Sequence, residues 1–189
     1  MGRKKLVWYP GAIYHITTRG NHRNDIFRDG QDYLVYLTIL KEALEKYDGI
    51  LYCYCLMTNH VHLIIETSDV VISEIMRRIN LFYTKYFNNK YNLIGHLFQG
   101  RYFSELIDKD EYILQASRYV HLNPVRANMV TKPEDYQWSS YPMYIGNIPE
   151  KLIISEKVLS YFKEKDKRIL YKKFVQSGIK IRYKEEEVI

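Results

Sequence analysis

The sequence has little of what marks secreted, disulfide-rich or membrane proteins. Only two of its 189 residues are cysteines, Cys53 and Cys55, and they stand two apart on a predicted strand, where a disulfide is sterically unfavourable. No apolar run approaches the roughly 18–20 residues that a transmembrane helix needs. The basic start, MGRKKLVWYPGAIYH, lacks the continuous apolar stretch of a signal peptide. These absences favour a reduced, cytoplasmic protein.

The composition that is present indicates a globular chain with a basic surface. Hydrophobic residues make up 47% and charged residues 26%, which allows one domain with a substantial core. The net charge of +6 favours a polyanionic partner such as a nucleic acid. Nineteen tyrosines are present. Tyrosines near Arg and Lys can stack on unpaired bases, but we expect most of them to fill the core and surface.

Hydrophobic periodicity predicts the element order β-α-β-β-α-β-α. The predicted strands cover residues 11–20, 49–57, 60–67 and 95–107. The first two predicted helices cover residues 32–46 and 73–91, the second with Ser73 as its cap. The third predicted helix begins at Asp108 or Asp110 and stops at Pro124. The first six elements match the α+β, ferredoxin-like βαββαβ pattern, an antiparallel sheet with helices on one face. We therefore expect a core of residues 1–130. Residues 131–189 would form a C-terminal accessory segment with one or two charged helices over 155–177.

The stretch LMTNHVHLIIE, residues 56–66, places two histidines in an apolar strand. Residues i and i+2 of a strand point to the same face, so His60 and His62 can present two nitrogens to one divalent cation. A metal site needs further ligands. A surface histidine beside a hydrogen-bonded core histidine explains the pattern as well, so the pair alone leaves the metal site open.

A second segment, RYVHLNPVRA at residues 118–127, supplies the groups that such a site would need. Tyr119 and Asn123 are i and i+4 on a helix and share a face, whereas His121 points elsewhere. A phenol can attack phosphorus, and an amide oxygen can bind Mg²⁺ or Mn²⁺. The alternative is an Asn-Pro helix stop with Tyr119 used only in packing.

Three strings in order resemble the single-tyrosine HUH transposases of the IS200-like superfamily, and above all the REP-associated tyrosine transposase branch. They are TNHVHLIIE, GHLFQGRYFSELI and YILQASRYVHLNPVRANMV, and the resemblance runs from about residue 11 to residue 143. It implies the HUH endonuclease fold. It also implies a metal-dependent enzyme, using Mg²⁺ or Mn²⁺, that cuts and rejoins single-stranded DNA beside hairpins during transposition.

The resemblance also implies roles for individual residues. His60 and His62 would be metal ligands, and Asn123 would occupy the position at which related enzymes complete the metal site with Gln or Asn. Tyr119 would be the nucleophile, forming a 5′-phosphotyrosine link that a second DNA 3′-OH then attacks. Tyr112, seven residues earlier on roughly the same helix face, and Tyr86, on the preceding helix, are weaker rivals for this role.

Other polar residues are candidates for positioning DNA, although each one taken alone is equally well a solvated surface group. The candidates after the first strand are Arg19, Asn21, His22 and Arg23; those on the second helix are Arg77, Arg78 and Lys85; and Arg101 is expected on the fourth strand. Several phosphate contacts together would make DNA affinity fall steeply with salt.

Three functions are consistent with the sequence. The first is a transposase or single-strand DNA endonuclease that acts as a monomer or homodimer. The second is a non-catalytic protein of the same fold that binds hairpin DNA or RNA. The third is a small metal hydrolase with water as nucleophile, which would not need Tyr119.

Overall fold

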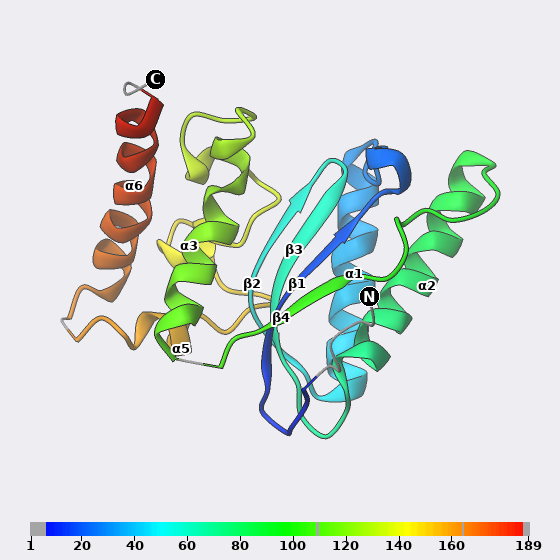
Figure 1. The fold of residues 1–189 in the computed structure, drawn as a ribbon, viewed down its shortest axis with the longest axis horizontal. Coiled ribbons are helices and arrows are strands. Elements are labelled where there is room, and N and C mark those ends of the chain that lie inside the picture. Colours follow the sequence, from blue (N-terminus) through cyan, green and yellow to red (C-terminus); the bar gives the residue numbers. More distant parts are fainter. Residues whose placement is uncertain (1–6, 109, 164, 187–189) are drawn as a thin grey trace.

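The computed structural model describes residues 7–108, 110–163 and 165–186 (Figure 1). The strands are β1 (Ile13–Arg19), β2 (Ile50–Met57), β3 (His60–Glu66) and β4 (Phe103–Leu106). The α-helices are α1 (Gly30–Tyr47), α2 (Ile72–Tyr91), α3 (Asp110–Arg126), α4 (Tyr141–Tyr144), α5 (Glu156–Leu159) and α6 (Lys167–Glu186), and the 3₁₀ turns are η1 (Asn21–Arg23) and η2 (Pro133–Asp135). The predicted order β-α-β-β-α-β-α is confirmed from β1 to α3, and a further long helix, α6, follows it.

The four strands form one antiparallel sheet in the order β2-β3-β1-β4, which confirms the predicted ferredoxin-like topology. In the register of β1 with β3, Thr17 lies opposite His62 and Arg19 lies opposite His60. In the register of β1 with β4, Phe103 lies opposite Thr17. Directly opposed residues project to the same face of a sheet, so these side chains share one surface.

The two faces of the sheet are covered by different helices. Helices α1 and α2 lie on one face, as predicted, while α3 and α6 lie on the other (Figure 1). Val61 and Leu63 alternate with the histidines along β3 and are completely buried, on the side of α1 and α2. His60 and His62 therefore face α3. None of the described helices is both long and apolar enough to cross a bilayer.

Many of the tyrosines are core residues, as the sequence predicted. The buried Tyr14, Tyr83, Tyr136 and Tyr144 each donate the hydroxyl hydrogen to a backbone carbonyl. Such residues contribute a large apolar ring to the core while their one polar atom remains hydrogen-bonded.

Two predicted boundaries are wrong, each because of a local feature of the backbone. Helix α2 begins at Ile72 after Val71, which makes no side-chain capping bond, so Ser73 lies inside the helix rather than at its cap. The fourth strand covers only Phe103–Leu106, because Gly95 and Gly100 adopt positive φ and bend the chain before it. Arg101 consequently lies in the bend before β4 and not on the strand.

The predicted stop at Pro124 is also wrong, since α3 continues to Arg126. A proline in a helix removes one backbone hydrogen bond, but the following turn closes through the Ala127 amide and the Asn123 carbonyl. Leu122 and Pro124 are buried. Tertiary packing therefore overrides the local tendency of the Asn-Pro step.

Residues beyond 130 pack against α3 and along the edge of β2, and the Trp138 ring stacks on Tyr33 of α1. The Ser140 amide donates to the Tyr54 carbonyl, and the Ile154 amide donates to the Leu51 carbonyl, so this segment follows the free edge of β2. The charged helical tail predicted over 155–177 corresponds to α5 and α6. The division of the chain at residue 130 remains a prediction.

Candidate active site

His60 and His62 use the same ring nitrogen, Nδ1, for their protein contacts. The Nδ1 of His60 lies 2.6 Å from the Asn59 Oδ1. The Nδ1 of His62 lies 3.1 Å from His15 Nε2 and 3.2 Å from the Thr17 hydroxyl. No hydrogen bond to Nε2 of either ring is found among the described residues. Holding Nδ1 in this way is the usual arrangement around histidines that bind metal through Nε2.

Burial keeps both imidazoles neutral at physiological pH. Burial, and then repulsion from Arg19 and from the protonated forms of His60 and His15, lower the pKa of His62 to about 2. Burial and then Arg19 lower the pKa of His60 to about 4. Neutral imidazole is the form that binds a metal ion, because a protonated ring has no free lone pair to donate.

Tyr119 stands over this group from α3. The centre of its ring is 5.6 Å from that of His62 and 5.7 Å from that of His15, with the rings edge to face. The side chain is 41% exposed, and no hydrogen bond to its hydroxyl is found in the described part of the chain. The guanidinium carbon of Arg126 lies 4.8 Å from the centre of the same ring. A solvent-accessible phenol thus lies beside two uncharged histidines and one arginine.

Asn123 occupies the next turn of α3. Its Nδ2 donates to the Tyr119 carbonyl at 2.8 Å, which leaves Oδ1 as the group able to bind a cation. The side chain is largely buried, and no hydrogen bond joins it to His60 or His62 among the described residues. His121 points away, as predicted: its two nitrogens contact the Tyr171 and Ser140 hydroxyls inside the protein.

The site also contains His15, Thr17 and Arg126, for which the sequence carries no clear signal. His15 and Thr17 repeat the i, i+2 spacing of His60 and His62, on a strand of alternating polarity. Their contact with His62 depends on the register of β1 with β3, which the sequence does not specify. Arg126 lies beyond the predicted helix stop, so its position seven residues after Tyr119 on the same helix follows only from the structure.

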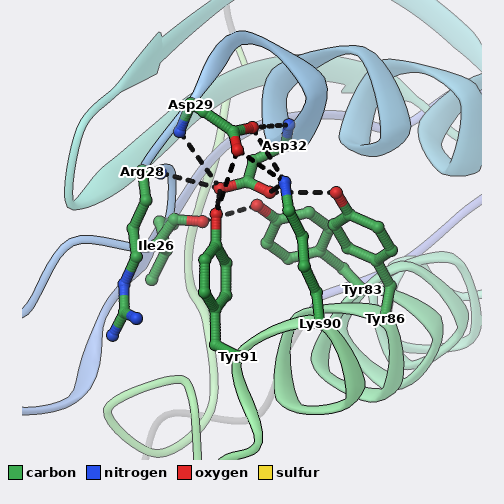
Figure 2. Close-up of polar contacts among 8 residues, drawn as sticks. All are labelled: Ile26, Arg28, Asp29, Asp32, Tyr83, Tyr86, Lys90 and Tyr91. Carbon is green, nitrogen blue, oxygen red and sulfur yellow. Dashed lines mark hydrogen bonds and ion pairs between the residues drawn. The ribbon is translucent and has the colours of Figure 1, made fainter.

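The rival tyrosine on α2 is removed from the histidines. The Tyr86 hydroxyl donates to Asp32 Oδ1 at 2.9 Å, and the buried Asp32 carboxylate also accepts from Lys90 and Tyr91 (Figure 2). Burial, then the hydrogen bond to Asp32, raises the pKa of Tyr86 despite the neighbouring Lys90. This polar cluster joins the start of α1 to the end of α2, on the sheet face opposite Tyr119.

Tyr112 is a closer rival, because it lies on the same helix face as Tyr119. Both side chains line a cleft of about 480 Å³ between α3 and the β1–β4 side of the sheet. His15 also lines this cleft. The Tyr119 ring packs against both His15 and His62, which favours Tyr119 over Tyr112.

Five of the candidate DNA contacts lie near the end of β1, beside the histidines. Arg19 is exposed and opposite His60, and Asn21, His22 and Arg23 form η1 immediately after it. Arg101 is exposed two residues after Gln99, whose amide donates to the Arg19 carbonyl. Together they form a basic rim on one side of the histidine pair.

Hydrogen bonds to Asn59 hold the turn that carries Asn21 and Arg23. Gly20 donates its amide hydrogen to the Asn59 carbonyl, and the Asn59 side chain donates to the Arg23 carbonyl. His22 and Arg23 both adopt positive φ, an uncommon conformation for residues with a side chain. A Cβ at Gly20 would overlap the Asn24 carbonyl oxygen, so only glycine fits there.

The three basic residues of α2 are not brought to the histidines. Arg77 pairs with Glu74, and the Arg78 guanidinium lies over the Phe82 ring. Lys85 is exposed. Helix α2 covers the sheet face opposite α3 (Figure 1).

The donor set fits a divalent cation held by two imidazoles and one amide oxygen. No cluster of three or more His, Cys, Asp or Glu side chains suited to a metal is assembled within the described residues. Two neutral imidazoles and the Asn123 amide oxygen form a smaller, mixed nitrogen and oxygen set, whose chemistry is compatible with Mn²⁺ or Mg²⁺ completed by water or phosphate oxygens.

Comparison with known proteins gives a family match and structural matches. Residues 9–123 match the family model described as "Transposase IS200 like". The structure of a REP-associated tyrosine transposase bound to a REP hairpin aligns with a TM-score of 0.64 and 17% identity, over 84% of this chain and 93% of that chain.

A candidate transposase from Deinococcus radiodurans aligns with a TM-score of 0.45 and 15% identity, over 63% of this chain and 95% of that chain. A TM-score at that level does not establish a shared fold. A search of curated proteins finds no match.

Proposed function

Since the family model covers residues 9–123, the chain belongs to the IS200-like transposases, and we propose that it cuts and rejoins single-stranded DNA through Tyr119. The observation that carries this proposal is the position of the Tyr119 ring, against His62 and His15 and partly open to solvent. Water as the nucleophile would not require a phenol at this position.

His60 and His62 would hold Mg²⁺ or Mn²⁺ through their Nε2 atoms, with Asn123 Oδ1 as the third ligand. When bound, such an ion polarises a non-bridging oxygen of the scissile phosphate and offsets the charge that develops in the transition state. The chain's own contribution is to keep both imidazoles neutral, by burial, and to orient them by hydrogen bonds. Asn59 orients His60, and His15 and Thr17 orient His62.

The Tyr119 oxygen attacks phosphorus, and the bond from phosphorus to the 3′ oxygen of the preceding nucleotide breaks. The 3′ oxygen leaves as a hydroxyl, taking up one proton while the phenol loses one, and the 5′-phosphate becomes linked to Tyr119. A second DNA 3′-OH reverses these steps and joins the new strands. One phosphodiester is exchanged for another, so no ATP is needed. Arg126 lies over the Tyr119 ring, where its charge stabilises the developing phenolate.

The substrate would be single-stranded DNA next to a hairpin. The structurally similar REP-associated transposase is bound to a REP hairpin. Arg19, Asn21, Arg23 and Arg101 line one side of the site, from where they can bind phosphates flanking the cleaved bond. Arg77, Arg78 and Lys85, on the far face, would bind only a DNA segment that wraps around the domain. We propose a cytoplasmic monomer or homodimer, with residues 1–130 as catalytic domain and 131–189 as accessory segment.

A labelled stem-loop DNA with single-stranded arms tests the proposal. We expect Mn²⁺ or Mg²⁺ to support cleavage and a covalent protein–DNA adduct on a denaturing gel, and EDTA to abolish both. The adduct should disappear in Tyr119→Phe and persist in the matched variants Tyr112→Phe and Tyr86→Phe. Cleavage that survives Tyr119→Phe would overturn the assignment. Tight hairpin binding without cleavage under either metal would instead identify a non-catalytic binding protein.

A further inference from the structure

The cleft of about 480 Å³ beside Tyr119 extends beyond the histidines and Tyr119 itself. It runs between α3 and the β1–β4 side of the sheet, and its wall nearest the histidines is made by His15 and Tyr119. A polymer whose scissile phosphate lies at Tyr119 would place its next chemical group here. The size is that of an ordinary small-molecule site.

Two exposed aromatic rings face this cleft from opposite elements. Phe103, on β4, is 61% exposed, and Tyr112, on α3, is 50% exposed. Tyr112, Ala116 and Tyr119 are i, i+4 and i+7 and form one face of α3, with the small Ala116 leaving space between the two larger rings. Exposed aromatic rings in a partly polar cleft are suited to stacking on a planar ligand.

Hydrogen-bond donors and acceptors also line the cleft. Glu105 is an exposed acceptor on β4, opposite His15 in the strand register. Gln115 accepts from Arg118 through Oε1 at 2.6 Å, so its Nε2 hydrogens are the groups available to a ligand. An acceptor and a donor near stacking rings match the edge of a nucleobase, which carries both N–H donors and ring-nitrogen or carbonyl acceptors.

We propose that this cleft binds one unpaired nucleobase of the nucleotide flanking the scissile phosphate. The base stacks on Tyr112 or Phe103 and presents its hydrogen-bonding edge to Glu105 and Gln115. This inference rests on the proposed function, since it takes the phosphate to lie at Tyr119. Its role is to fix which phosphodiester bond faces the Tyr119 oxygen, so the cleft determines the position of the cut.

Photo-crosslinking locates the base even when the target sequence is unidentified. The probe is a stem-loop DNA with single-stranded arms of mixed sequence, in which 5-iodouracil replaces thymine. It is irradiated on the Tyr119→Phe variant, which keeps the ring but cannot form the covalent link, so base binding is measured independently of cleavage. We expect mass spectrometry to find crosslinks on Tyr112 or Phe103. Phe82, 44% exposed on the opposite side of the molecule, is the internal control.

Affinity measurements then test the coupling between the base and the cleft. In the same background, Tyr112→Ala and Phe103→Thr should each weaken binding of the intact probe by about 5- to 150-fold, the range expected for one stacked base. Neither variant should weaken binding of a probe that is abasic at the crosslinked nucleotide. Phe82→Ala should leave the affinity for the intact probe and for the abasic probe unchanged.

Crosslinks confined to other residues, or equal losses for intact and abasic probes, would overturn the inference. The proposed strand cleavage would be refuted if wild-type protein forms no adduct. If Tyr112→Ala and Phe103→Thr still weaken binding of the intact probe and not of the abasic probe, the cleft remains a base-binding site. The two failures are therefore distinguishable.

Discussion

Replacing His15 with phenylalanine keeps a ring that stacks on His62 and removes the nitrogen 3.1 Å from His62 Nδ1. The remaining contact of that Nδ1 is the Thr17 hydroxyl at 3.2 Å. Loss of a group that orients a metal-binding histidine reduces metal affinity by about 10- to 100-fold. Because Thr17 still accepts a hydrogen bond, we expect His15→Phe to fall near the 10-fold end, about 1.4 kcal/mol. The double variant His15→Phe/Thr17→Val should approach 100-fold.

The assay is calorimetric titration of Mn²⁺ into the protein without DNA at neutral pH. Thr38→Val, which removes an exposed hydroxyl on α1, is the matched control and should bind Mn²⁺ as the wild type does. Circular dichroism and urea unfolding without metal establish that each variant is folded. Folded single and double variants that bind Mn²⁺ with wild-type affinity would refute the idea that His15 and Thr17 orient His62.

Three further predictions concern the scaffold. Gly20→Ala should lower the free energy of unfolding by about 1–3 kcal/mol, because its Cβ meets a backbone oxygen, whereas Gly30→Ala, with no atom nearer than 3.8 Å, should be neutral or slightly stabilising in the same urea titration. Burial lowers the pKa of His121 to about 3, below the pKa of about 6.5 of a histidine in the unfolded chain, so the neutral buried ring stabilises the fold fully above pH 6.5 and less as pH falls toward 3. His121→Gln should therefore reduce the slope of unfolding free energy against pH between pH 3 and 6.5 by about 1.4 kcal/mol per pH unit. An unchanged slope would contradict this. Asp32→Asn should lower the free energy of unfolding by about 3 kcal/mol, because the buried carboxylate accepts hydrogen bonds from Lys90 and from the backbone amide of Arg28, just before α1. An unchanged midpoint of thermal unfolding would show that the cluster in Figure 2 does not stabilise the protein.

The sequence is most informative where one element determines the geometry. Strand periodicity alone places His60 and His62 on one face, and helical spacing alone places Tyr119 and Asn123 on adjacent turns. These relations do not depend on the rest of the fold. The order of strands and helices is likewise recoverable, because the apolar pattern changes period at each boundary.

Relations between elements are not recoverable in the same way. The contact of His15 with His62 requires the register of two strands that are separated by α1 and β2. The position of Arg126 requires α3 to continue through Pro124, which packing rather than local preference decides. The apolar and aromatic surroundings of Arg101 predict a strand, while two glycines with positive φ bend the backbone before it.

The central claim is that Tyr119 is the nucleophile that becomes covalently linked to DNA. The most direct measurement is to digest the protein after incubation with stem-loop DNA and Mn²⁺, and to identify the nucleotide-bearing peptide by mass spectrometry. We predict that the peptide containing Tyr119 carries a 5′-phosphorylated nucleotide on the phenolic oxygen, and that no such peptide forms with EDTA. A nucleotide on Tyr112, or efficient cleavage with no linked peptide, would contradict the account.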